Sequence, residues 1–168
     1  MEKNTLKMNN EKIKMDIRLS GDSLVRYYYL VYLIKANLGE KFTESSLFTI
    51  AVKSMAMLLS EEDNRMNFID NLSKMEYQEI EIFKNVNVGN TKKSKTRRSL
   101  LVSIETIGCY NQISYICKIA LKNIKISSDF FIDLALKSLG IQLKDKELHW
   151  IDSIDKADWP QIIYEKKK

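Results

Sequence analysis

The stretch Lys12-Ile13-Lys14-Met15-Asp16-Ile17-Arg18-Leu19 alternates strictly between polar and apolar residues. This period of two is typical of a half-buried strand, because successive side chains of a strand point to opposite faces. One predicted face carries Ile13, Met15, Ile17 and Leu19, and the other carries Lys12, Lys14, Asp16 and Arg18. We therefore expect a strand here, with one face toward the core and one toward solvent.

Two helices separated by a polar turn are predicted after this strand. Residues 20–23 form a turn that can cap a helix, and an apolar stripe at helical spacing then extends to Leu38. Gly39 provides a helix stop, and residues 42–46 offer several N-cap candidates for a second helix that extends to about Leu59. The stripe of the first helix consists of Tyr27, Leu30, Val31, Ile34 and Leu38.

The same order of elements is predicted a second time, from about Arg97 to Leu143. The second strand, Ser99 to Ile104, matches the first with Val102 aligned on Ile17, which is an offset of 85. The turn at 126–129 matches the first turn at an offset of 84, and the helix after it is expected to end near Gly140. The clearest match aligns Ile50-Ala51-Val52-Lys53-Ser54-Met55 with Leu134-Ala135-Leu136-Lys137-Ser138-Leu139. A repeated unit in a basic chain indicates a pseudo-symmetric DNA-binding protein.

The rest of the chain divides around these two repeats, which we place at 12–59 and 97–143. Residues 1–11 are expected to form a flexible arm. Residues 60–96 form an acidic spacer, helical over about 64–83, followed by a basic linker. The C-terminal tail, 144–168, holds both tryptophans.

The composition favours a helical protein in a reducing, cytoplasmic compartment. Of 168 residues, 45% are apolar and only one is proline, so long helices are favoured. Cys109 and Cys117 lie eight residues apart on one predicted helix, about 12 Å and too far for a disulfide. The N-terminus shows no secretory signal, and the densest apolar run, 27–34, is too short to cross a membrane.

No residue pattern indicates catalysis, a cofactor or a metal. His149 is the only histidine and has no evident nucleophilic partner, and it cannot complete a zinc site with two cysteines. Asp152, Asp155 and Asp158 recur every three residues but lack the spacing and glycine of a calcium loop. We therefore expect a protein that is not an enzyme.

The net charge of +5 is distributed unevenly. Residues 91–143 carry nine Lys/Arg against three Asp/Glu, and residues 13–59 carry six against four. Residues 60–90 carry three against seven. Basic repeats around an acidic spacer suit a molecule with one side facing a polyanion. A charge of +5 is also ordinary for a Lys-rich chain, so charge alone leaves this interpretation open.

Strand, helix, polar turn and helix in this order resemble the ribbon-helix-helix family of DNA-binding proteins, to which the Arc and Met repressors belong. The resemblance covers the two repeats. It implies that two copies pair, that their strands form an antiparallel ribbon entering the major groove, and that four helices build the core. Most members carry one copy per chain, so two copies here imply a single-chain pseudodimer. The implied fold is mostly α with a short two-stranded antiparallel β-ribbon, packed as one pseudo-twofold domain.

By position, the resemblance also implies which residues contact DNA. The base-facing residues would be Lys14, Asp16 and Arg18 in the first copy and Ser99, Leu101 and Ser103 in the second. Phosphates would be held at the helix starts by Thr43, Ser45, Ser127 and Ser128. Apart from the resemblance, affinity without sequence information would come from the basic cluster Lys92, Lys93, Lys95, Arg97 and Arg98. Lys12 is also expected to contact the nucleic acid.

Two of these residues depart from the usual pattern. Asp16 would repel phosphates, although a carboxylate can accept a hydrogen bond from cytosine N4. Leu101 can contact only a thymine methyl group. Arg18, in contrast, could bind guanine in a bidentate manner, which is worth about 1–3 kcal/mol of discrimination. The departures predict a weakly specified second half-site or a register that is off by one.

The predicted function is sequence-specific binding of double-stranded DNA by a cytoplasmic repressor, plasmid partition factor or conjugation accessory protein. The partner is DNA and not a membrane, and the chain would act as a monomeric pseudodimer, with higher assembly on DNA left open. A protein partner could bind through 60–90 or 144–168. Two alternatives stay open: an all-helical interaction module without DNA binding, and an oligomer whose strands pair between chains.

Overall fold

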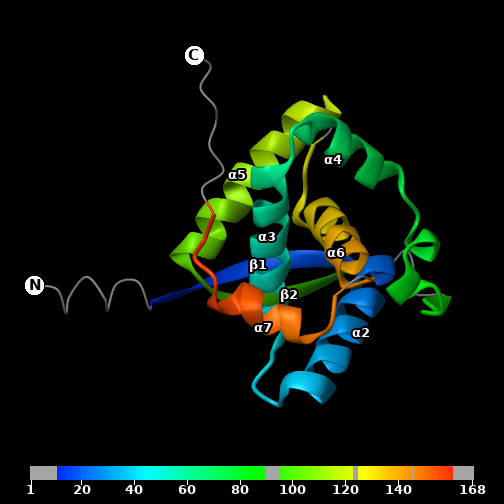
Figure 1. Cartoon of the computed structure of the whole chain (residues 1–168), viewed down its shortest axis with the longest axis vertical. Helices are drawn as coiled ribbons and strands as arrows, with labels where there is room; N and C mark the ends of the chain where they lie inside the picture. The colour runs from blue at the N-terminus through cyan, green and yellow to red at the C-terminus, as the bar shows by residue number, and fades with distance from the viewer. Residues whose placement is uncertain (1–10, 90–94, 123–124, 145, 161–168) are drawn as a thin grey trace, which may run out of the picture.

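The computed structural model describes residues 11–89, 95–122, 125–144 and 146–160. The described chain is mostly helical and contains one two-stranded sheet (Figure 1). The elements are β1 (Lys12–Ser20), α2 (Gly21–Leu38), α3 (Glu44–Glu61), α4 (Arg65–Lys74), the 3-10 turns η1 (Tyr77–Glu79) and η2 (Glu81–Phe83), β2 (Lys95–Ser103), α5 (Ile104–Leu121), α6 (Ser128–Lys144) and α7 (His149–Lys156).

β1 and β2 form an antiparallel ribbon within the chain. The register runs from Lys12 opposite Ser103 to Ser20 opposite Lys95, with Asp16 opposite Ser99 at the middle. The inner face is mostly apolar, and four of its side chains are at most 2% exposed: Ile17, Leu19, Leu100 and Val102. The mostly helical fold with a short antiparallel ribbon is therefore confirmed, and the alternative expectation of an all-helical fold is wrong.

A serine ends each strand and caps the helix that follows. The hydroxyls of Ser20 and Ser103 accept hydrogen bonds from the backbone N–H of Ser23 and Thr106, at 3.3 and 3.2 Å. Such caps satisfy N–H groups that the first helical turn leaves unpaired. Each cap begins a helix of 18 residues, so the order strand–helix–helix occurs twice.

These caps correct the predicted alignment of the two strands. The capping serines are separated by an offset of 83, the same as between Asp16 and Ser99 at the middle of the ribbon, whereas the apolar pattern predicted an offset of 85. The second strand begins at Lys95 rather than Ser99, and Ile104 is the first residue of α5, not part of the strand. Because both offsets are odd, the predicted faces of each strand are unchanged.

The core lies between α3 and α6, which are in contact in the middle of the molecule, with α5 on one side and α2 on the other (Figure 1). Both central helices are buried around most of their circumference. Even the lysines of the matching segments, Lys53 and Lys137, are only 3% and 6% exposed. Helices hydrophobic nearly all round are expected inside a bundle, and here they also support the inner face of the ribbon.

Both central helices end later than predicted. α3 extends to Glu61, two residues beyond the expected end at Leu59. α6 continues through Gly140 to Lys144, because Gly140 is buried against η2 instead of ending the helix. Over the range 64–83, where one helix was expected, Arg65–Lys74 forms α4, and the 3-10 turns η1 and η2 follow it.

The spacer follows the first repeat but packs against the second, and the tail follows the second repeat but packs against the first. α4 packs against α5 and α6, which follow β2, whereas α7 packs against α3, which follows β1. The two segments bury Ile69, Leu72, Tyr77 and Phe83 from the spacer and Ile151 and Ile154 from α7. Each segment therefore lies over helices of the repeats and adds to the common core.

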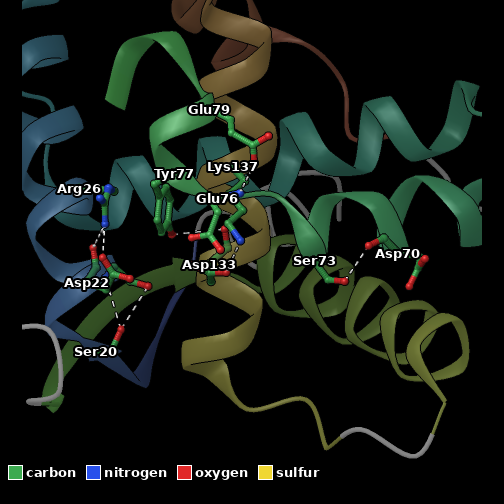
Figure 2. A network of polar contacts seen from close by, with 11 residues as sticks. Ser20, Asp22, Arg26, Asp70, Ser73, Glu76, Tyr77, Glu79, Asp133 and Lys137 are labelled. Atoms are coloured by element: carbon green, nitrogen blue, oxygen red, sulfur yellow. Dashed lines mark hydrogen bonds and ion pairs between the residues drawn. The ribbon is translucent and has the colours of Figure 1, made fainter. Parts of the chain in front are cut away.

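Tyr77 joins the spacer to two buried cations (Figure 2). Its ring lies against the guanidinium of Arg26, with Cζ 4.1 Å from the ring centroid, and Lys137 Nζ lies 5.3 Å from the same centroid. Arg26 pairs with Asp22, and Lys137 pairs with Asp133 at 3.0 Å. Charges this deeply buried are tolerated only when paired, so the spacer closes over the α2 and α6 cations.

The tail covers the corresponding lysine of α3, as the spacer covers Lys137. Lys53 Nζ donates to the carbonyl of Asp155 at 3.1 Å and lies 5.2 Å from the centroid of the Trp159 ring. Burial lowers the pKa of Lys53, partly offset by the nearby charge of Asp155. Each buried lysine thus faces an aromatic ring from a segment outside the two repeats.

None of the helices in the described ranges is both long and apolar enough to cross a membrane.

Cys109 and Cys117 are free and buried in α5. Burial raises the pKa of these thiols to about 11 and about 12, respectively. Because the thiolate is the reactive form, neither cysteine is a good nucleophile in the folded chain.

Two glycine substitutions test the packing of α6 against η2. A Cβ on Gly140 would lie 2.7 Å from Phe83 Cε2 and 2.9 Å from Ile80 Cγ2, whereas a Cβ on Gly108, in α5, meets nothing within 4 Å. We expect Gly108→Ala to stabilise the fold by up to about 1 kcal/mol through helix propensity. Gly140→Ala should destabilise it, because overpacking costs about 1–3 kcal/mol. Urea unfolding measures both, and equal stabilisation by the two substitutions would contradict the packing of η2 on α6.

Candidate nucleic-acid interface

The outer face of the ribbon is a continuous exposed surface built from both strands. Opposite residues of an antiparallel pair share a face, so the register places the even-numbered residues of β1 beside the odd-numbered residues of β2. We call this surface the ribbon face. Its exposed members are Lys12, Lys14, Asp16, Arg18, Lys95, Arg97, Ser99 and Leu101.

The ribbon face carries five cations and one carboxylate. Within the described ranges, none of the five cations forms an ion pair. Arg18 lies directly opposite Arg97, an arrangement in which like charges destabilise a sheet. An anion over this pair would relieve that repulsion, so the ribbon face is suited to a polyanion.

Asp16 and Ser99 occupy the middle of the ribbon face. The Ser99 hydroxyl donates to Asp16 Oδ1 at 2.6 Å. This bond fixes the orientation of the carboxylate and uses one of its two oxygens. A carboxylate accepts several hydrogen bonds, so Asp16 can still accept one from a base.

The start of each central helix holds the edge of one strand. The backbone N–H of Leu101 donates to Ser45 Oγ, and that of Arg18 donates to Ser128 Oγ, both at 3.0 Å. The N–H of Ser20 donates to Asp129 Oδ1 at 2.8 Å. β2 is therefore held by the α3 start and β1 by the α6 start, so that the two repeats interlock.

The hydroxyls predicted to bind phosphate all accept hydrogen bonds from backbone N–H groups of the chain. Thr43 accepts from the N–H of Ser46 at 3.1 Å, and Ser127 accepts from the N–H of Phe130 at 3.2 Å, so both cap a helix. Ser45 and Ser128 hold the strand edges. The helix starts do flank the ribbon, and phosphate binding there stays a prediction, because a hydroxyl that accepts a hydrogen bond still carries an O–H donor.

Acidic residues also occupy these helix starts. Glu44 lies in the first turn of α3, and Asp129 lies in the first turn of α6. The hydroxyl of Tyr28 donates to Glu44 Oε1 at 2.6 Å. Burial, followed by this bond to Glu44, raises the pKa of Tyr28 to about 12, so the hydroxyl stays protonated and continues to donate.

The structure separates the other predicted residues into three groups. Ser103 is half-buried and caps α5, so it does not belong to the ribbon face. Arg98 points to the inner face, where its guanidinium lies 5.4 Å from the centroid of the Tyr28 ring. Lys92 and Lys93 lie outside the described residues.

Arg97 is a residue whose position sequence reasoning missed, as are Lys95 and Arg98. It was expected in a basic cluster that binds phosphates, and the structure places it on the ribbon face opposite Arg18. Aligning the two capping serines would have matched Arg97 with Lys14 and placed it on this face. The sequence therefore did contain a signal for the position of Arg97, which was the pair of capping serines and not the apolar pattern.

Removing the strand-edge acceptors tests the interlock. Ser45→Ala and Ser128→Ala each leave a backbone N–H of the ribbon without its acceptor, and we expect each to lower the free energy of unfolding by about 1 kcal/mol. Ser60→Ala is the matched control, because its exposed hydroxyl bonds only within its own helix. Thermal or urea unfolding gives the comparison. Equal effects at all three positions would show that the strand edges are not held in this way.

Comparison with known proteins identifies no relative of this chain. No family model matches the chain, no curated protein matches it, and no solved structure matches it. The case for a function therefore rests on the ribbon face and on the elements that hold it.

Proposed function

We propose that this chain binds double-stranded DNA in a sequence-specific manner, as a single-chain ribbon-helix-helix pseudodimer. The ribbon face would lie in the major groove. The observation that carries the proposal is the ribbon face itself, with five exposed cations, one carboxylate and no ion pair within the described part of the chain. The shape fits as well, because a two-stranded ribbon can enter a major groove about 12 Å wide.

The duplicated order of elements supports the pseudodimer. When the two strands are aligned on their capping serines, Asp16 is matched with Ser99, and the same two residues also lie opposite each other in the ribbon. An approximate twofold axis through this pair would relate the two halves of the ribbon. The exchanged contacts of the helix starts with the strand edges agree with this symmetry.

The chemistry of the ribbon face provides both affinity and readout. Lys12 and Lys95 lie at opposite ends of the ribbon, where contacts with phosphates would release counterions. Arg18 and Arg97 lie nearer the middle, where each guanidinium could bind guanine O6 and N7 with about 1–3 kcal/mol of discrimination. Backbone N–H groups at the α3 and α6 starts would add phosphate contacts beside the groove.

A role in repression, plasmid partition or conjugation is consistent with such binding, in a reducing cytoplasm that keeps Cys109 and Cys117 as thiols. A protein partner has less support from the structure. The apolar residues of α4, η1, η2 and α7 are already largely buried against the chain's own helices. DNA binding is the function that the exposed surface favours.

Salt-dependent gel shifts with selected and random duplexes test the proposal. We expect Lys95→Gln to weaken all duplexes about equally and to reduce the salt slope by about 1, as for a lost phosphate contact. Arg18→Ala should instead lower the preference for the selected duplex, by about 1–3 kcal/mol, because it removes a base contact.

The matched control is Lys74→Gln, which removes one positive charge from the exposed surface of α4. It should change neither the slope nor the preference. If the unmodified chain binds no duplex at low salt, or binds with a slope near zero, the proposed function is wrong.

A further inference from the structure

We propose that the DNA target is non-palindromic, with a guanine-containing half at one end of the ribbon face and a thymine-containing half at the other. This inference rests on the proposed function and deepens it. It comes from a comparison of the two ends of the ribbon face, which carry different chemistry although the backbone elements are matched. A symmetric dimer of identical chains would present the same residues at both ends.

The first end presents two guanidinium groups. Arg18 from β1 and Arg97 from β2 lie opposite each other and are both exposed. The matched end pairs Lys14 with Leu101. The approximate symmetry therefore relates Arg18 to Leu101 and Arg97 to Lys14, so that one end has two arginines and the other has none.

The arginine end is suited to guanine. An arginine side chain binds O6 and N7 of guanine in a bidentate manner, the commonest specific contact in the major groove. Each of the two adjacent guanidinium groups can bind one guanine, and the guanine acceptor atoms would also offset the repulsion between the two positive charges. This end is therefore expected to contact G·C pairs.

The other end is suited to a thymine methyl group. The Leu101 side chain is 59% exposed on the ribbon face and offers no hydrogen bond. Two further apolar residues at this end are exposed, Ile13 at 39% and Ile104 at 50%. Their counterparts at the arginine end are Thr96 and Gly21, so only the Leu101 end has an apolar rim. Apolar contact is the means by which proteins recognise the C5-methyl group of thymine.

Asp16 marks the centre of the target. It lies beside the approximate axis. Its counterpart on β2 is Ser99, which donates a hydrogen bond to it, so the two strands present different side chains even at this position. The carboxylate can accept from cytosine N4. The target is thus expected to contain a central G·C pair whose cytosine lies on the side of Asp16.

Substitutions that make the two ends equal test the inference. In Arg97→Lys/Leu101→Arg, each end carries one arginine and one lysine, and in Lys14→Arg/Arg18→Leu, each end carries one arginine and one leucine. The full-length chain and both double variants are used to select from a random duplex pool. Charge-matched controls on exposed positions of α4 are Asn71→Arg and Lys74→Gln.

We expect the unmodified chain to select a non-palindromic sequence and each double variant to select a different sequence that is palindromic on either side of the central pair. In competition, the unmodified chain should prefer its own sequence to either palindrome by about 10-fold or more, since one mismatched pair typically costs about 1–3 kcal/mol. The two controls should select the same sequence as the unmodified chain.

Two results would overturn the inference while leaving DNA binding intact. One is a palindrome selected by the unmodified chain, and the other is an unchanged sequence selected by both double variants. A chain that enriches no sequence and binds no duplex would overturn the proposed function, and this inference with it.

Discussion

The antiparallel pairing of β1 with β2 joins two segments that are far apart in the sequence, with α2, α3, α4, η1 and η2 between them. An isolated two-stranded ribbon is marginally stable in water and needs a packed face to persist. Here the inner face buries Ile17, Leu19, Leu100 and Val102 against the helices, which leaves the outer face free. The helices thus serve to hold one short ribbon in position, and the ribbon brings cations from two distant segments onto one surface.

The interlock explains why neither repeat is complete alone. The edge of β2 is bound by the start of α3 through Ser45, and the edge of β1 is bound by the start of α6 through Ser128. The spacer and the tail add further contacts, with Tyr77 covering Lys137 and Trp159 facing Lys53. Contacts exchanged at the ribbon edge and over the central helices fix the two repeats relative to each other. A rigid ribbon can present its charges without reorganising them when an anion binds.

Much of this arrangement could be predicted from local pattern, and the errors have physical causes. The alternation from Lys12 to Leu19 predicts the ribbon face, because a period of two does not depend on the partner strand. The offset was wrong by two because the apolar pattern aligns three apolar pairs at 85 and only two at 83, and only the capping serines indicate the smaller value. Arg98 was misplaced because the start of β2 lies in a basic run that resembles a linker. Gly140 does not end α6, since its packing on η2 is a tertiary contact that sequence does not reveal.

The most direct test of the central claim is an NMR titration of the labelled chain with a selected duplex. The account predicts that the side-chain signals of Arg18, Arg97 and Leu101 shift and show contacts with major-groove protons, while those of Tyr77 and Ile154, buried away from the ribbon face, stay in place. Shifts confined to α7 or to the spacer, with the ribbon signals unchanged, would contradict the account.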